Sequence, residues 1–160
     1  MDYVFYDFAQ ARCRLEFQDT PAQQSESVSM QVARFLFTHL DSYGDPIDDI
    51  VRCLEYASVP GCGQGGAVLL ARDPQANNAV VAAVVFNKTG MTRYIPENIL
   101  VYIAVHRDYR GQGLGAELIR RSLEQVAGSI ALHVEADNPA KFLYQKLGFE
   151  NKYLEMRLQR

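Results

Sequence analysis

The chain has 160 residues, of which 48% are hydrophobic and 22% charged, and its net charge is −3. This length and composition predict one globular domain over residues 1–160, large enough to bury a core without metals or disulfides. Because proteins that bind nucleic acid or anionic membranes usually carry a basic excess, we expect neither as a partner.

The cysteines and the N-terminal residues favour a cytoplasmic protein. There are three cysteines: Cys13, Cys53 and Cys62. Their odd number and wide spacing fit neither a disulfide framework nor a C-x-x-C metal site, so reduced thiols are expected. Asp2 and Asp7 stand in a region where a signal peptide would be basic. The longest apolar run, residues 79–86, is far shorter than the ~20 residues that span a bilayer.

The first half of the chain predicts one strand, two helices and a hairpin. The first strand falls either at residues 3–8 or at residues 15–17. Apolar residues then recur at steps of three and four, which predicts helices over about residues 25–40 and from residue 47 onward. Gly44 and Pro46 separate the two helices. A glycine-rich loop precedes two strands, residues 67–71 and 79–86, which we expect to form a hairpin.

The second half alternates strands and helices. We expect strands at residues 99–105, 130–135 and 153–158, and helices over residues 114–127 and from Asn138-Pro139 to Gly148. Asn is a favoured cap and Pro a favoured first residue of a helix, while Gly commonly ends one. A strand–helix–strand unit of this length predicts a right-handed crossover between parallel strands 99–105 and 130–135.

The most informative stretch is Val105–Ala116, between a buried strand and an amphipathic helix. Gly111, Gly113 and Gly115 leave the backbone uncovered, so its N–H groups can converge on an anion at the start of the helix. Arg110 adds a full positive charge and a planar group suited to phosphate. Together these features predict a pyrophosphate site.

A dinucleotide-binding fold is the rival interpretation of this loop. Gly111, Gly113 and Ala116 satisfy G-x-G-x-x-A, and Glu135 lies at about the right distance beyond them. Only 25 residues follow Glu135, however. Several further parallel strands would be needed to complete such a fold, so this interpretation ranks last.

Two motifs resemble those of the GNAT N-acetyltransferases. Arg110-Gly-Gln-Gly-Leu-Gly115 is similar to the family's coenzyme A loop, R/Q-x-x-G-x-G/A. Residues 130–149 are similar to its second signature, with matches at Leu132, Val134, Asn138, Tyr144, Gly148 and Phe149. Arg107 stands where proline is usual, and Ala140 lies one residue before the small residue's usual place. The motifs cover about a third of the chain, and the order of elements agrees over residues 25–160.

The resemblance implies the GNAT acyltransferase fold, which is α/β (α+β mixed). Its sheet is mixed and mostly antiparallel, with about six or seven strands, a splayed parallel central pair and about four flanking helices. Acetyl-coenzyme A is the implied cosubstrate, with its pantetheine arm on the backbone of the splayed strand. The implied cofactor-binding residues are Ile103, Ala104, Val105, Arg110, Gly111, Gln112, Gly113, Leu114, Gly115, Ala116, Asn138 and Tyr144.

The implied reaction is direct attack of a primary amine on the thioester in a ternary complex, with no metal. Tyr144 is the candidate acid that protonates the leaving thiolate. Glu97 is the candidate base, although it stands about two residues earlier than the family's usual glutamate. His133 and His106 are alternatives for the base.

The acceptor is not identified by the sequence. The region that shapes the acceptor groove in the family carries here the residues His39, Asp41, Tyr43, Asp45, Asp48 and Asp49. Its acidity favours a cationic small-molecule or peptide amine, although acidic residues are also ordinary at helix starts. A domain that binds acyl-coenzyme A without turnover is the second functional hypothesis, and a homodimer is left open.

Overall fold

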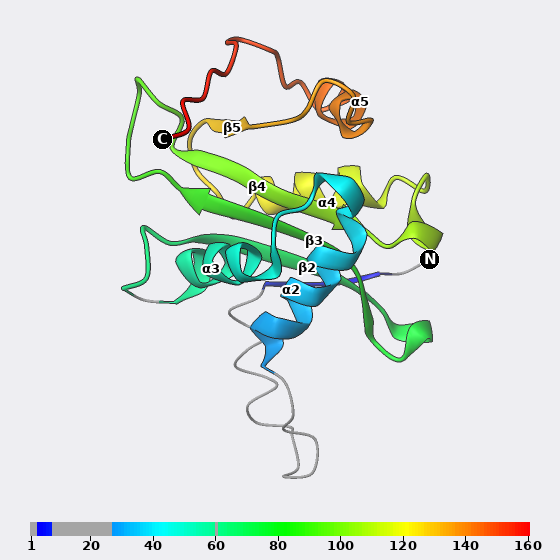
Figure 1. Cartoon of the computed structure of the whole chain (residues 1–160). Coiled ribbons are helices and arrows are strands. Elements are labelled where there is room, and N and C mark those ends of the chain that lie inside the picture. Colours follow the sequence, from blue (N-terminus) through cyan, green and yellow to red (C-terminus); the bar gives the residue numbers. More distant parts are fainter. Residues whose placement is uncertain (1–2, 8–26, 60) are drawn as a thin grey trace.

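The structure is a computed structural model that describes residues 3–7, 27–59 and 61–160 (Figure 1). Cys13 and the alternative first strand at residues 15–17 therefore lie outside the described residues. Among the described helices, none is long and apolar enough to cross a membrane.

In the described part of the chain, a five-stranded sheet forms the centre of the molecule (Figure 1). Its strands, in spatial as well as chain order, are β1 (Val4–Asp7), β2 (Gly66–Asp73), β3 (Ala79–Lys88), β4 (Asn98–Val105) and β5 (Ile130–Leu132). The first four strands pair antiparallel, and β4 pairs parallel with β5. The mixed sheet and its parallel pair confirm the expected fold, although the described sheet has fewer strands than the six or seven expected.

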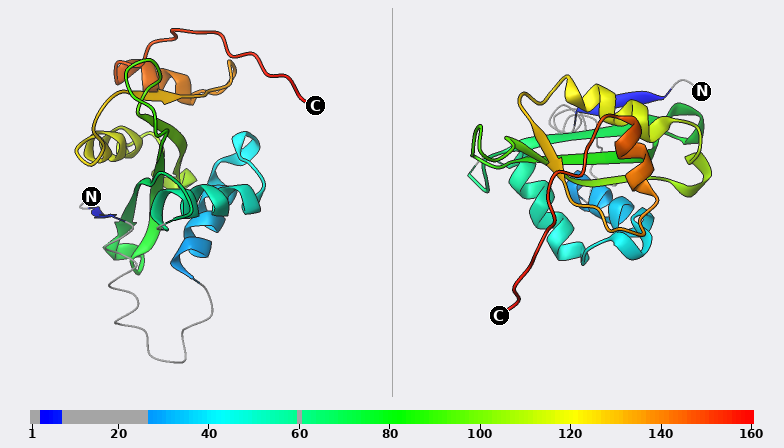
Figure 2. Two further views of the ribbon diagram at one scale, coloured as in Figure 1. Left: turned by 90° about the vertical axis from the view of Figure 1, so that its left-hand side faces the viewer. Right: turned by 90° about the horizontal axis from the view of Figure 1, so that it is seen from above.

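The described residues form four α-helices, which pack around the sheet. They are α2 (Val28–His39), α3 (Ile47–Ser58), α4 (Leu114–Leu123) and α5 (Ala140–Lys146), joined by the short 3-10 helices η1 (Asp41–Tyr43), η2 (Pro74–Ala76) and η3 (Arg107–Tyr109). Helices α2 and α3 pack on one face and α4 on the other, with α5 beyond β5 (Figures 1 and 2).

The uninterrupted apolar run of β3 is explained by this layering. Ala83 and Val85 point into the core beneath α2 and α3, whereas Val84 and Phe86 point into the core beneath α4. A strand buried on both faces needs apolar residues at every position rather than at alternate ones. The expected hairpin of β2 and β3 forms, and its turn places Asn77 in the left-handed conformation (φ +54°) that asparagine tolerates.

The prediction of a strand at residues 153–158 is wrong, because no strand forms there. This part of the described chain pairs with no strand, and the end of the chain projects beyond the helices and the sheet (Figure 2). The exposed fractions of Tyr153, Leu154, Met156 and Leu158 lie between 78% and 93%. Alternation predicts which side chains would share a face of a strand, but a strand forms only where a neighbour completes its hydrogen bonds. The described β5 is also shorter than the expected residues 130–135.

Candidate active site

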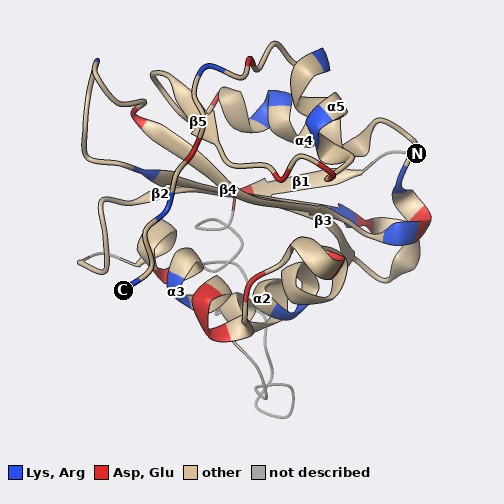
Figure 3. Ribbon diagram, turned by 45° about the horizontal axis from the view of Figure 1, so that its top comes forward, with Lys and Arg blue, Asp and Glu red and all other residues tan. Residues whose placement is uncertain are grey.

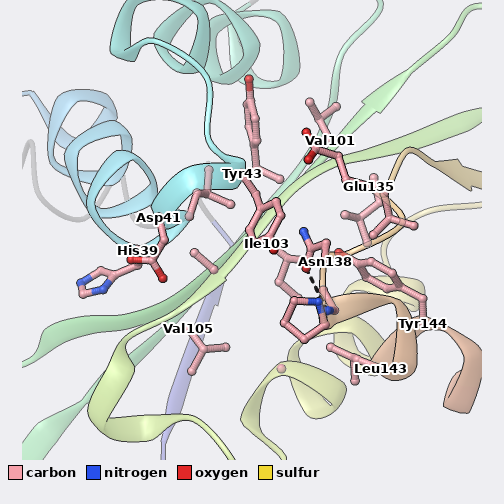
Figure 4. A pocket seen from close by; sticks show the side chains of 18 of the residues that line it. His39, Asp41, Tyr43, Val101, Ile103, Val105, Glu135, Asn138, Leu143 and Tyr144 are labelled. Carbon is pink, nitrogen blue, oxygen red and sulfur yellow. Dashed lines mark hydrogen bonds between the residues drawn. The ribbon is translucent and has the colours of Figure 1, made fainter.

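A pocket of about 1150 Å³ opens where β4 and β5 separate (Figure 4). The parallel register ends at Leu100, which is paired with Leu132. At the same point the antiparallel β3–β4 ladder shifts: Val85 pairs with Tyr102 and Phe86 with Leu100, so Val101 is the extra residue of a bulge. The second half of β4 therefore has a free edge toward the pocket.

This free edge suits an extended chain that carries amides. Ile103, Ala104 and Val105 pair with β3 on one side and line the pocket on the other. Backbone groups of a strand point alternately to its two sides, so part of this stretch faces the gap. An amide-containing arm can bond there as an added strand would. The expected splayed parallel pair is thus confirmed, and it coincides with the pocket.

The glycine loop forms one end of the pocket. Gly111 and Gly113 have φ values of +76° and +82°, which glycine adopts without strain. Gly113 is the N-cap of α4 and supplies no side-chain bond, so the N–H groups of the first turn of the helix are left for a ligand. A Cβ at Gly115 would lie 3.4 Å from Leu143 and 3.5 Å from Val105. The glycines therefore leave a backbone cradle open to an anion.

Most of the expected cofactor-binding residues come together here. The pocket is lined by Ile103, Ala104, Val105, Arg110, Gly111, Gly113, Leu114, Gly115, Ala116, Asn138 and Tyr144. Gln112 does not line it: its side chain bonds to the Asp108 carbonyl at 3.2 Å and accepts a hydrogen bond from the Tyr3 hydroxyl at 3.2 Å. Only the backbone of Gln112 can share in an anion site at the loop.

The positive charge at this site is local. Acidic and basic residues are interspersed over the elements in the view of Figure 3. Arg110 is the cation of the loop, and its guanidinium donates to the carbonyls of Val105 and His39 and to the carboxylate of Asp41, at 2.9, 2.8 and 3.1 Å. The structure therefore places Arg110 between the loop and the end of α2.

Tyr144 and Asn138 face the β4 edge from α5 and from the segment just before it (Figure 4). The Asn138 side chain accepts a hydrogen bond from the Ala140 N–H at 2.9 Å, just before α5, but the N-cap of this helix is Pro139 rather than the expected Asn138. Tyr144 is 7% exposed, and its ring packs edge-on against Phe149. Burial alone raises the pKa of Tyr144 to about 12. Its phenol is thus protonated throughout the neutral range.

The structure does not bring Glu97 to this pocket. Glu97 precedes β4 at the end away from the separation, where its carboxylate accepts hydrogen bonds from the N–H groups of Ser129 (2.7 Å) and Arg93 (3.2 Å). These bonds lower the pKa of Glu97. Glu97 therefore links the β3–β4 loop to the residue just before β5.

Of the two alternative bases, His133 lies in the pocket and His106 does not. His133 lines the pocket, with its imidazole 3.8 Å from the Glu155 carboxylate. His106 is not among the lining residues, and its ring packs against that of His39 with 4.5 Å between centroids. Burial and the nearby His106, Arg110 and Arg107 lower the pKa of His39.

One polar pair in the pocket was not singled out from the sequence. The Tyr102 hydroxyl donates to the Asp45 carboxylate at 2.6 Å, and both residues line the pocket. Burial and this carboxylate raise the pKa of Tyr102 well above its usual range. No sequence signal joins two residues 57 positions apart, although the place of Tyr102 in a buried strand marks its hydroxyl as one that needs a partner.

We predict that Glu97→Gln changes stability rather than the pH–rate profile. Because bonding to Ser129 and Arg93 depresses the pKa of Glu97, its stabilisation is present above the unfolded pKa of ~4.3 and is lost as the pH falls through the lower folded value. The melting temperature of Glu97→Gln should therefore lie below that of the wild type at pH 7, with the difference shrinking below about pH 4.

Thermal melts across pH and the pH dependence of kcat/KM check this prediction. Glu124→Gln, a change of the same kind at an exposed site, is the control and should alter neither quantity. A selective loss of rate at acidic pH in Glu97→Gln would instead assign the base to Glu97.

Comparison with known proteins gives a consistent picture. The family model described as "Acetyltransferase (GNAT) domain" matches residues 64–151. A mycothiol acetyltransferase of Corynebacterium aurimucosum is 44% identical over 52 residues, which are 29% of this chain and 17% of that protein. The cysteine-rich protein 2-binding protein of Mus musculus is 35% identical over 57 residues, 35% of this chain and 7% of that protein. The chain thus matches less than a fifth of either relative's length.

A solved structure supports the same architecture over nearly the whole chain. The aminoglycoside antibiotic 6′-N-acetyltransferase of Acinetobacter baumannii superimposes with a TM-score of 0.64 and 14% identity. The alignment covers 99% of this chain and 98% of that one. At this identity the likeness concerns the fold.

Proposed function

Because the chain belongs to the GNAT acetyltransferase family, whose model matches more than half of it, we propose that it transfers the acetyl group of acetyl-coenzyme A to a primary amine. One observation carries the proposal: the free edge of β4 and the glycine cradle meet in a single pocket with Tyr144. Release of free coenzyme A that depends on an added amine is the experiment that tests it.

Each part of the pocket matches a part of the cosubstrate. The N–H groups of the first turn of α4 and of the loop before it would bind the pyrophosphate, aided by the partial charge of the helix start. The edge of Ile103, Ala104 and Val105 would bind the amides of the pantetheine arm. Gly111 and Gly113 support this fit, because their positive φ values favour glycine and a residue without a side chain leaves the backbone of the loop uncovered.

The proposed chemistry uses groups of this pocket and water. The amine nitrogen forms a bond to the thioester carbon, the carbonyl electrons move onto its oxygen, and the intermediate expels the thiolate. A backbone N–H at the bulge of β4 would stabilise the oxyanion. The Tyr144 hydroxyl would donate a hydrogen bond to the departing sulfur, and the ammonium proton leaves through water or a pocket carboxylate. In this scheme the protein supplies no nucleophile of its own.

Asp45 is the proposed contact for a cationic acceptor. Tyr102 holds one oxygen of its carboxylate in the pocket, and the other oxygen can accept a hydrogen bond from an ammonium group. The carboxylates of Asp41 and Glu155 have partners in Arg110 and Arg157. The hydrogen-bond partner of Asp45 is the neutral Tyr102, and Arg157 acts on Asp45 only through its electrostatic field, so the Asp45 carboxylate keeps an oxygen for the acceptor.

We predict that Asp45→Asn raises the KM for the acceptor about tenfold, equivalent to about 1.4 kcal/mol, with little change in kcat. The amide keeps the bond with Tyr102 but removes the negative charge. Steady-state kinetics at saturating acetyl-coenzyme A measure the effect. Tyr102→Phe keeps the charge and frees the carboxylate, so its KM should rise less. Equal, unaltered KM values in both variants would exclude Asp45 from acceptor binding.

A further inference from the structure

Arg110 joins two parts of the site that lie 69 residues apart in the chain. One is the glycine loop, and the other is the turn of residues 40–43 that follows α2, which we call the acceptor-side turn. We propose that Arg110 is a positioning residue, which fastens the acceptor-side turn to the loop and so sets the wall of the acceptor pocket. The name acceptor-side turn, and this inference with it, rests on the function proposed above.

Three acceptors surround the guanidinium of Arg110. Its Nε donates to the last carbonyl of β4, on Val105, at 2.9 Å. Its Nη2 donates to the carbonyl of His39, the last residue of α2, at 2.8 Å, and its Nη1 to Asp41 at 3.1 Å. The last carbonyls of a helix have no partner within the helix, so Arg110 also caps α2. A rigid planar group with three fixed partners sets the distance between β4 and the turn.

The acceptor-side turn has a backbone that needs such support. Asp41 is in the left-handed conformation, with φ at +54°, which residues other than glycine adopt at a cost. Its carboxylate is the one that Arg110 holds. Two residues later, the Tyr43 hydroxyl reaches the carbonyl of Asp137, just before Asn138, at 3.5 Å. The turn thus spans the pocket from the loop to the start of α5 (Figure 4).

This role differs from that of a simple phosphate ligand. A guanidinium has five N–H groups, and three of them are used by Val105, His39 and Asp41. The remaining two could still contact an anion, so binding of the cosubstrate and support of the turn can coexist. What separates the two roles is the quantity that changes when the contact with Asp41 is removed: acceptor binding if Arg110 supports the turn, cosubstrate binding if it only binds phosphate.

Two substitutions test the proposal from opposite ends of the ion pair. Asp41→Asn keeps the size and the tolerance for positive φ but removes the charge. Arg110→Lys keeps the charge near the loop but removes the planar group that joins three partners. We expect each to raise the acceptor KM about fivefold and the double variant to raise it no further, while the Kd for acetyl-coenzyme A stays within about twofold. Arg107→Lys, the same change at an exposed neighbour, is the control.

Amide hydrogen exchange of residues 40–43 gives a readout that does not need turnover. We expect faster exchange in Asp41→Asn and Arg110→Lys than in the wild type or Arg107→Lys, even if no amine proves to be an acceptor. Failure of the proposed function is therefore distinguishable from failure of this inference. Unchanged exchange and acceptor KM, together with weaker binding of acetyl-coenzyme A in Arg110→Lys, would overturn the inference and leave Arg110 as a phosphate ligand.

Discussion

Gly113→Val is expected to abolish measurable binding of acetyl-coenzyme A while the protein stays folded. Gly113 caps α4 with φ at +82°, at the edge of the pocket where N–H groups are left without partners. A branched side chain there would cover the groups that the pyrophosphate must approach. The left-handed backbone costs a valine about 1–2 kcal/mol, which is less than the ~5–15 kcal/mol that stabilises a typical domain.

Gly65→Val is the matched control for backbone strain. Gly65 has nearly the same φ, +84°, and a Cβ added there would likewise meet no atom within 4 Å, but it lies just before β2 and does not line the pocket. Isothermal titration with acetyl-coenzyme A and a thermal melt should show both variants folded and only Gly65→Val binding. Normal affinity in a folded Gly113→Val would remove the basis for placing the pyrophosphate at the loop.

Tyr144→Phe is expected to lower kcat roughly 100-fold, about 2.7 kcal/mol of barrier, with little change in the KM for acetyl-coenzyme A. The phenylalanine keeps the ring contact with Phe149 and deletes only the hydroxyl. Burial raises the pKa of Tyr144 to about 12, and burial in this pocket would also raise the pKa of the coenzyme A thiol. The phenol therefore remains protonated and can donate a hydrogen bond to the developing thiolate. We expect no loss of rate through ionisation of Tyr144 at neutral pH.

Steady-state and single-turnover kinetics with a good acceptor measure this effect. Tyr153→Phe, the same chemical change at a side chain that is 78% exposed, should leave kcat unaltered. If Tyr144→Phe turns over at a near-native rate, Tyr144 is a packing residue and the thiolate leaves without its help.

The glycine loop and its surroundings could be predicted because their signal is local. Gly111 and Gly113 mark positions of positive φ, and Asn138 marks the start of α5, so short stretches of sequence carry the information. The helices α2 and α3 follow from the spacing of residues that pack on one face of the sheet. Burial on both faces likewise explains why β3 could be recognised from a continuous apolar run.

The parts that could not be predicted depend on partners distant in the chain. Glu97 is an even number of residues from Val101, which predicts that the two side chains share a face of the strand. This spacing does not show at which end of the strand β4 and β5 separate. The bonds of Arg110 to the end of α2 and of Tyr102 to Asp45 are made across the fold. The segment of residues 153–158 has the alternation of a strand without a neighbouring strand to complete it among the described residues.

Release of free coenzyme A from acetyl-coenzyme A, followed across a panel of primary amines, tests the central claim most directly. The panel should include polyamines, amino sugars and peptide amines, each with mass spectrometry of the acceptor. We predict amine-dependent release by the wild-type protein, matched by one acetyl group on the acceptor, with the rate lowered in Tyr144→Phe. Tight binding of acetyl-coenzyme A without release by any amine would contradict the account and leave a domain that binds the thioester without turning it over.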